Sequence, residues 1–430
     1  MSIIDKDSLL QETNLNADAL ARLQEIGWVD LVIGIPSHRN GRTIGEVVKA
    51  LADGIAMYFP NERVLLMNAD GGSSDNTVRH ILDAKVSSKV EKLVTVYEGT
   101  RGKGTGIRSI FEAALRLDAR ACVIAEARAP GITPEWLPAL VNPVLHGHDV
   151  SMGCYQRSAN AAALTDNLVY PFLGTFLRAD LREPLAGEFC VSGDLATELV
   201  AQDVWETDVA RFGINIWLAI QVLVEHRRIA LVDLGYRGEN GGELGTLVDA
   251  RFLHTVGTLF RALVIHRRWW QENTPPVHVP LYGERHPAVG MVCSDECVRI
   301  LADAMFNARD EYITEWQRIL FPQTYEMILD LLKQPRDGFS LSAELWARIV
   351  SEFAIVYNKG EGDPDKVAEA LLPLYYGRAA HYVQSTQNLA PLERETVVQD
   401  ILRAFQNTKP FFIERWNDYD SSIDVSEYWF

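Results

Sequence analysis

The feature that most constrains the fold is an alternation of short apolar runs with amphipathic helical patterns between residues 28 and 126. The apolar runs are WVDLVIGIP (28–36), RVLLMNAD (63–70), KLVTVYE (92–98) and ACVIAE (121–126). Helical patterns lie between them, including TIGEVVKALADGIAMYF (43–59) and GIRSIFEAALRLD (106–118). Strands that alternate with helices in this way form parallel βαβ units whose sheet is covered on both faces. The sequence therefore predicts an α/β fold with a Rossmann-like, mostly parallel sheet.

Unusual residues, several of them charged, gather where these predicted strands end. They are Pro36, Ser37 and Arg39 after the first strand, Asp70 at the end of the second, and the triplet Glu126-Ala127-Arg128 after the fourth. Ligands of open α/β sheets bind at the carboxyl ends of the strands. The sequence therefore predicts a ligand site at this edge of the sheet.

The loop RGKGTGIRS (101–109) adds a cation to that edge. Gly102 and Gly104 would let the backbone approach a ligand, Lys103 carries a charge suited to phosphate, and a helix begins directly afterwards. The spacing is not that of a Walker A loop. We interpret Lys103 as a phosphate ligand, with a solvated turn as the alternative.

The pattern changes near residue 290, after which the chain is helical in character. We predict four parts: an N-terminal helical extension (1–27), an α/β domain (28–272), a Pro-rich connection (273–290) and a smaller, all-helical C-terminal domain (291–430). The connection carries two secondary site candidates, His278 and His286. Aromatic residues recur at helical spacing in the tail, as expected of a helical core or a subunit interface, and we expect a homodimer.

Composition and charge argue against some classes of partner. The chain has 430 residues, 47% hydrophobic and 23% charged, which is typical of globular proteins. Its net charge of −17 argues against a nucleic-acid partner, which would require clustered cations. No apolar run approaches the roughly 20 residues that cross a bilayer, and the N-terminus lacks the pattern of a signal peptide. We therefore expect a cytoplasmic location and no membrane partner.

Several motifs together resemble a known family. They are IPSHRNGRTI, NADGGSSDNT, RGKGTGI, the Glu126-Ala127-Arg128 triplet, PLAGEF (184–189), FGINIWL (212–218) and LGYRGEN (234–240). In order and spacing they resemble GT-A glycosyltransferases of the retaining glucosyl-3-phosphoglycerate synthase and mannosylglycerate synthase group. The helical tail from FSLSAELWARIV to AAHYVQST resembles the C-terminal region of mannosylglycerate synthase.

The resemblance implies roles for individual residues. The nucleotide base and ribose would lie against Pro36, Ser37, Arg39 and Asp70, and the nucleotide would also contact Lys103 and Gly104. The sugar and acceptor pocket would be lined by Leu185, Ala186, Gly187 and Glu188. Arg157 would lie close to the acceptor, where a guanidinium suits a carboxylate or phosphate.

Three polar positions depart from the family pattern. Arg128 stands where the second Asp of a metal-binding D-x-D motif is expected. The position of a metal-binding His falls at Gly238 or Glu239, and Asn215 replaces an acidic residue. Glu126 and Glu239 are left as an incomplete Mg²⁺ or Mn²⁺ site. The catalytic candidates are then Arg128, Glu188 and Asn215.

Two interpretations of Arg128 follow. In the first, Arg128 and Lys103 give the departing diphosphate the positive charge that a metal would supply, while Glu126 binds ribose or orders Arg128. In the second, the site no longer transfers sugar by the family route, and the chain either binds a ligand without turnover or uses a different donor. A purely structural alternative for Arg128 is a local salt bridge with Glu126 or Glu188. A nucleotidyltransferase would fit the sheet but lacks its Gly-rich N-terminal loop.

The resemblance implies transfer of a hexose from a nucleoside diphosphate sugar to a small acidic acceptor, of the glycerate or phosphoglycerate type, as in the synthesis of compatible solutes. Retaining enzymes of this fold are thought to let the departing phosphate take the acceptor proton. Such a route needs no separate base, so it is compatible with Asn215.

Overall fold

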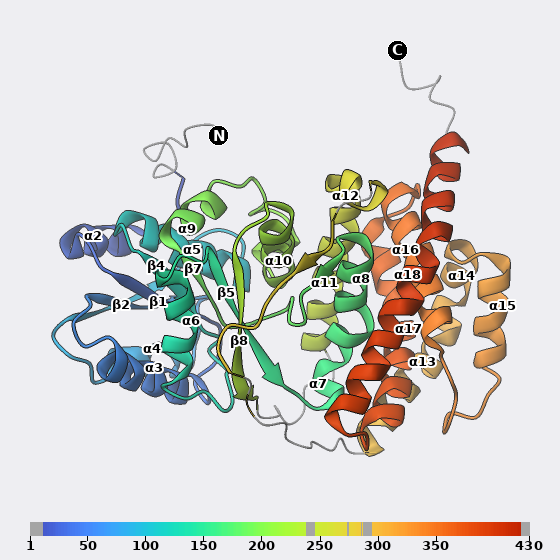
Figure 1. Cartoon of the computed structure of the whole chain (residues 1–430), viewed down its shortest axis with the longest axis horizontal. Helices are drawn as coiled ribbons and strands as arrows, with labels where there is room; N and C mark the ends of the chain where they lie inside the picture. The colour runs from blue at the N-terminus through green and yellow to red at the C-terminus, as the bar shows by residue number, and fades with distance from the viewer. Residues whose placement is uncertain (1–11, 238–245, 273–274, 285, 287–294, 423–430) are drawn as a thin grey trace, which may run out of the picture. The chain divides into compact units, whose positions relative to one another are not determined.

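The first compact part of the chain is built on a seven-stranded sheet (Figure 1). The computed structural model describes residues 12–422 except 238–245, 273–274, 285 and 287–294. The sheet order is β3-β2-β1-β4-β7-β5-β8. The strands are β1 (Leu31–Ser37), β2 (Val64–Asp70), β3 (Val90–Val96), β4 (Ala121–Ile124), β5 (Val150–Gln156), β7 (Phe189–Ser192) and β8 (Ile229–Tyr236).

One strand of this sheet, β7, runs against the others. It pairs antiparallel with both β4 and β5, whereas the pairs β1–β2, β1–β4, β2–β3 and β5–β8 are parallel. The residue that precedes β7 therefore lies at the same sheet edge as the residues that follow β4 and β8. Because Phe189 pairs with Ile124, this reversal brings residue 188 next to the residues that follow β4.

Helices cover both faces of the sheet (Figure 1). One layer contains α5 (Lys103–Arg116) and α9 (Gly193–Val200), which pack on each other, and the other contains α3 (Ile44–Tyr58) and α6 (Trp136–Leu145). The remaining helices of this part are α2 (Ala17–Ile26), α4 (Thr77–Leu82), the 3₁₀-helix Asp208–Ala210 and α10 (Ile214–Val224). A hydrophobic core forms between the α3/α6 layer and the sheet, including Ile33, Leu51, Val123, Leu137 and Leu140.

The rest of the chain forms a second compact unit that is almost entirely helical. Its helices are α7 (Ala159–Leu164), the π-helix Thr165–Val169, α8 (Tyr170–Phe176), α11 (Thr246–Ile265), α12 (Arg267–Gln271), α13 (Asp295–Asn307), α14 (Arg309–Ile319), α15 (Pro322–Leu331), α16 (Ala343–Lys359), α17 (Pro364–Thr386) and α18 (Pro391–Ser422). The short strands β6 (Ala179–Asp180) and β9 (Val277–His278) pair in parallel. Side chains cap α16 and α17 at their first turns, from Ser342 and Asp363 respectively. The predicted fold class, a mostly parallel α/β sheet followed by a helical C-terminal region, is confirmed.

The two units interleave along the sequence. The first comprises residues 1–156, 185–242 and 279–287, and the second comprises 157–184, 243–278 and 288–430. Residues 157–184 and 243–272, which fall inside the predicted 28–272 domain, thus cluster with the helical unit. In the 273–290 connection, residues 273–278 and 288–290 belong to the second unit and residues 279–287 to the first. That 28–272 folds as a domain of its own stays a prediction.

The glycines of the Lys103 loop approach the protein's own backbone. A Cβ on Gly104 would lie 1.8 Å from the Val209 carbonyl oxygen, and one on Gly102 would lie 2.3 Å from the carbonyl oxygen of Ala210. The Gly104 N–H donates to the Arg211 carbonyl at 3.1 Å. The structure gives these glycines a packing role at the start of α5. Their close approach to a ligand stays a prediction.

We predict that Gly104→Ala lowers the free energy of unfolding by about 3 kcal/mol or more, because a methyl group cannot fit against the backbone of residues 209–210. Urea unfolding followed by circular dichroism measures the loss. Gly45→Ala is the control, because its Cβ would meet only the His80 ring, at 3.0 Å. Equal stability of Gly104→Ala and the wild type would contradict the packing role.

Candidate functional site

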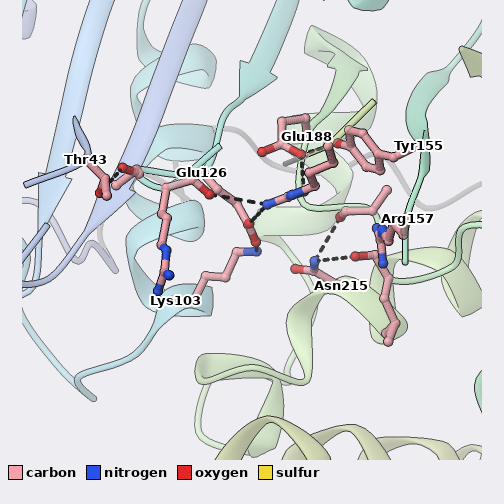
Figure 2. Close-up of polar contacts among 12 residues, drawn as sticks. Thr43, Lys103, Glu126, Tyr155, Arg157, Glu188 and Asn215 are labelled. Atoms are coloured by element: carbon pink, nitrogen blue, oxygen red, sulfur yellow. Dashed lines mark hydrogen bonds and ion pairs between the residues drawn. The ribbon is translucent and has the colours of Figure 1, made fainter. Parts of the chain in front are cut away.

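Five side chains meet at the carboxyl edge of the sheet, and we call them the strand-end cluster: Lys103, Glu126, Tyr155, Glu188 and Arg237. Lys103 is the first residue of α5, Glu126 follows β4, Tyr155 is near the end of β5, Glu188 precedes β7 and Arg237 follows β8. Figure 2 shows Lys103 directed at Glu126 and Tyr155 directed at Glu188. All five belong to the first unit.

Arg237 connects the two acids of the cluster. One terminal nitrogen of its guanidinium, Nη2, donates to Oε2 of Glu126, and the other, Nη1, donates to Oε2 of Glu188 at 2.9 Å. Nη2 also lies 3.3 Å from the backbone carbonyl oxygen of Arg128. The guanidinium carbon is 5.0 Å from the centroid of the Tyr155 ring, a cation–π contact. The guanidinium fork is thus held at several points.

The charge state of Arg237 follows from these contacts. Its side chain is only 13% exposed. Burial alone would lower the pKa of Arg237, but the Glu188 and Glu126 carboxylates outweigh it and hold that pKa well above its ordinary value. Arg237 is therefore a permanent cation between two acids.

Glu188 is the most deeply buried acid of the cluster, with no solvent exposure. Burial raises the pKa of the Glu188 carboxyl above its ordinary value, and Arg237 opposes this rise while Glu126 adds to it. Oε2 accepts the hydroxyl hydrogen of Tyr155 as well as the Arg237 bond. Within the described residues, nothing donates a hydrogen bond to Oε1. Oε1 of Glu188 can therefore accept a hydrogen bond from a ligand.

Glu126 is held between two cations. Its Oε1 lies 2.5 Å from the Lys103 Nζ, and its Oε2 pairs with Arg237. The carboxylate packs against the backbone of Gly187, where a Cβ would lie 2.5 Å from the Glu126 carboxyl carbon. Gly187 is thus required for Glu126 to reach its partners.

Arg128 lies two residues beyond Glu126 and is partly buried. The turn that carries it is anchored by Thr43, whose hydroxyl donates to the Ala127 carbonyl at 2.8 Å (Figure 2). The ion pairs that the structure describes for Glu126 and Glu188 include those with Lys103 and Arg237. A salt bridge from Arg128 to Glu126 or Glu188 stays a prediction.

The predicted base and ribose residues lie at the ends of β1 and β2. Oδ1 of Asp70 accepts hydrogen bonds from the hydroxyls of Ser37 (2.8 Å) and Ser73 (2.7 Å), and Oδ2 accepts from the backbone of Gly72 and Ser73. Pro36 is buried within β1. Asp70 therefore orders the turn after β2, which leaves its carboxylate little capacity for a ligand. Arg39, exposed and left-handed at φ 55°, is the member of the group that faces solvent.

Asn215 supports the loop before β7. Its Nδ2 donates to the carbonyl oxygens of Leu185, at 3.2 Å, and Ala186, at 2.8 Å. An acidic side chain has no hydrogen to donate and would place its charge against two carbonyl oxygens. This accounts for an amide at the position where the resemblance expects an acid. Asn215 Oδ1 is buried and has no hydrogen-bond partner among the described residues.

Other candidates lie elsewhere or outside the described residues. Arg157 belongs to the second unit, where its guanidinium lies 2.7 Å from the Glu183 carboxylate, so its acceptor role stays a prediction. Glu239 and Gly238 lie outside the described residues. His286, on the Pro-rich stretch, lies 3.4 Å from the Asp233 carboxylate in the first unit, and His278 pairs with Asp180 in the second.

The strand-end cluster does not fit a divalent metal. A metal would need carboxylate oxygens of Glu126, and both are bound by cationic side chains. In the part of the chain that the structure describes, no group of three or more His, Cys, Asp or Glu residues is arranged to hold a metal ion. No described helix is long and apolar enough to span a membrane.

Sequence reasoning missed Arg237 and Tyr155. Arg237 lies within the motif LGYRGEN (234–240), and Tyr155 lies two residues before Arg157. The available signal was position, since each lies at or just beyond the end of a strand at the same sheet edge. Arg237 directly precedes Gly238 and Glu239, the two positions at which the resemblance expects a metal-binding His.

We predict that Asn215→Asp is less stable than the wild type by about 1–3 kcal/mol, because two carbonyl oxygens lose their donor and gain a charged neighbour. Asn215→Ala is the matched control, since it removes the donor without adding charge. Urea unfolding at neutral pH should show a lower free energy of unfolding for Asn215→Asp than for Asn215→Ala. The gap should narrow at acidic pH, where the aspartate is protonated, and a ranking of Asp above Ala at neutral pH would contradict this role.

We also predict a pH-dependent effect of Glu188→Gln. Because burial raises the folded-state pKa of Glu188 above 4.5, its favourable contribution is present below that pH and is lost as the pH rises through the raised value. Urea unfolding between about pH 4 and pH 7 should show the variant gaining stability relative to the wild type. The exposed Glu206→Gln should show no such trend, and a pH-independent difference for Glu188→Gln would contradict the prediction.

Comparison with known proteins finds only distant similarity. No family model matches the chain, and no curated protein does. Among solved structures, the chain is similar to glucosyl-3-phosphoglycerate synthase from Mycobacterium tuberculosis. The complex of that protein with Mn²⁺, uridine diphosphate and glucosyl-3-phosphoglycerate is 19% identical, with a TM-score of 0.43, over 58% of this chain and 85% of that one. Its complex with Mn²⁺, uridine-diphosphate-glucose and phosphoglyceric acid is 18% identical, with a TM-score of 0.42, over 58% and 84%. Identity and TM-scores at this level assign neither a family nor an activity to this chain.

Proposed function

We propose that this protein is a retaining glycosyltransferase that moves a hexose from a nucleoside diphosphate sugar to a small acidic acceptor without a metal ion. The observation that carries the proposal is the position of Lys103, which is the first residue of α5 and lies beside the end of β4, at the edge of the sheet where ligands of such folds bind. The motifs that resemble retaining GT-A enzymes lie along the same edge.

The cations near this edge suit a diphosphate. Lys103 is the first residue of the 14-residue helix α5, whose N-terminus also favours negative charge. Arg128 follows on the turn after β4. Fixed cations stabilise the charge that develops on a departing phosphate without needing to reorganise. We therefore assign the diphosphate to Lys103 and Arg128.

The buried acceptor atoms suit a sugar. Oε1 of Glu188 and Oδ1 of Asn215 are buried and have no donor among the described residues. Leaving such atoms without a partner costs free energy, which the hydroxyl groups of a hexose would offset by donating to them. This assignment agrees with the sugar pocket that the resemblance places at Leu185, Ala186, Gly187 and Glu188.

The proposed reaction balances without a separate base. The bond between the anomeric carbon and the diphosphate oxygen breaks, and the acceptor hydroxyl oxygen forms a new bond to that carbon on the same face. The acceptor proton passes to the departing phosphate. Asn215 has no role in proton transfer in this scheme and supports the loop that carries Glu188.

A second function is favoured by one observation. Lys103 and Arg237 are already paired with carboxylates, so a donor must compete with Glu126 for them. A nucleotide-sugar-binding protein without turnover would tolerate that competition better than an enzyme that must stabilise a transition state.

The test combines binding with turnover. UDP-glucose and GDP-mannose are titrated calorimetrically, and release of UDP or GDP is followed with D-glycerate or 3-phosphoglycerate as acceptor, with EDTA or with added Mg²⁺ or Mn²⁺. We expect release that persists in EDTA. Lys103→Ala should weaken donor binding by about tenfold or more, and Arg128→Ala should lower kcat/KM by about 100-fold or more.

Matched controls separate site effects from general loss of charge. Lys49→Ala removes an exposed lysine of α3, and Arg120→Ala removes an exposed arginine at the opposite end of β4 from Arg128. Both should behave like the wild type. Donor binding without release under any metal condition would support the second function, and absence of binding to every donor would overturn both.

A further inference from the structure

The guanidinium of Arg237 lies where two acids from different strand ends converge. Glu126 follows β4 and Glu188 precedes β7, and one side chain from beyond β8 bonds to both. Two carboxylates brought together in a buried site repel each other unless a cation lies between them. Arg237 meets that requirement from within the chain.

A divalent metal would meet the same requirement in the same way. It would bind carboxylate oxygens from neighbouring strand ends, neutralise them and fix their orientation. We propose that Arg237 is a positioning residue that takes the place of a divalent metal in this site and thereby excludes one. The inference deepens the proposed function and rests on it for the role of the site.

The geometry favours Arg237 over the other cations for this task. Lys103 contacts only Glu126 among the two acids, because the described partners of Glu188 are Tyr155 and Arg237. A planar guanidinium donates through separate nitrogens in a fixed fork, whereas an ammonium acts as a point charge. The Tyr155 ring packs against the guanidinium, and the Tyr155 hydroxyl donates to Glu188. These two contacts hold the guanidinium in place between the acids.

The contacts of Arg237 with the two acids also determine the net charge of the cluster. Lys103 and Arg237 balance Glu126 and Glu188 when both acids are ionised. A metal added to this set would place a double positive charge beside two cations, which Coulomb repulsion disfavours in a buried site. The cluster therefore excludes metal by charge as well as by occupying the carboxylate oxygens.

The experiment measures Mn²⁺ binding directly, by electron paramagnetic resonance and calorimetry on the full-length protein without donor or acceptor. We expect the wild type to bind no Mn²⁺ at this site. Arg237→Ala, which removes the guanidinium from Oε2 of both acids, should gain Mn²⁺ binding at least about tenfold tighter than any residual binding by the wild type. Adding Glu126→Gln to Arg237→Ala should abolish that gain, which locates the ion.

Two further variants guard against misfolding and unspecific effects. Arg237→Gln keeps a hydrogen-bonding side chain without the charge and should also gain Mn²⁺ binding, whereas the exposed Arg228→Ala should not. A rise in melting temperature on adding Mn²⁺, seen for Arg237→Gln and not for the wild type, provides a second readout.

The outcomes separate this inference from the proposed function. Mn²⁺ bound by the wild type through Glu126, or no gain in either Arg237 variant, would overturn the inference even if sugar transfer is observed. A gain in both variants supports the inference even if the wild type transfers no sugar.

Discussion

The site depends on one pair of hydrogen bonds, which the Arg237 guanidinium donates to the carboxylates of Glu126 and Glu188. This pair joins the end of β4, the start of β7 and the end of β8, which the sheet order keeps near one another. Burying two acids is costly unless each is paired, and a buried pair is in turn strongly destabilised when one partner is removed. The cluster therefore acts as a unit, in which Lys103 and Tyr155 complete the pairing of the two acids.

Close packing around the cluster explains several residue choices that motif comparison alone leaves unexplained. Gly187 is small because the Glu126 carboxyl lies against it, and Gly104 is small because α5 starts against the backbone of residues 209–210. Asn215 is an amide because it donates to two carbonyl oxygens. In each case the constraint comes from a neighbour distant in sequence. Residues attributed to ligand contact thus also have structural roles.

The surroundings of Glu126 disfavour a further acid at position 128. With Arg237 and Lys103 on its two oxygens, Glu126 is neutralised internally, so a second metal-binding acid at position 128 would add an unpaired negative charge nearby. The backbone carbonyl oxygen of Arg128 accepts a hydrogen bond from Arg237. Glu126, the turn that carries residue 128 and Arg237 are therefore parts of one arrangement.

Local patterns in the sequence were enough to predict the elements and the sheet edge at which the strand-end cluster lies. The strand predicted at 63–70 corresponds to β2 (Val64–Asp70) and the helix predicted at 43–59 to α3 (Ile44–Tyr58), because apolar periodicity and turn residues are local signals. Polar residues after predicted strands likewise pointed to the edge where the strand-end cluster lies. Only the tertiary structure decided the partners: that Lys103 pairs with Glu126, that Arg237 bridges two acids, and that residues 157–184 cluster with the helical unit. The reason is that these contacts join residues far apart in the chain, and the reversed direction of β7, which brings Glu188 to the site, leaves no local mark in the sequence.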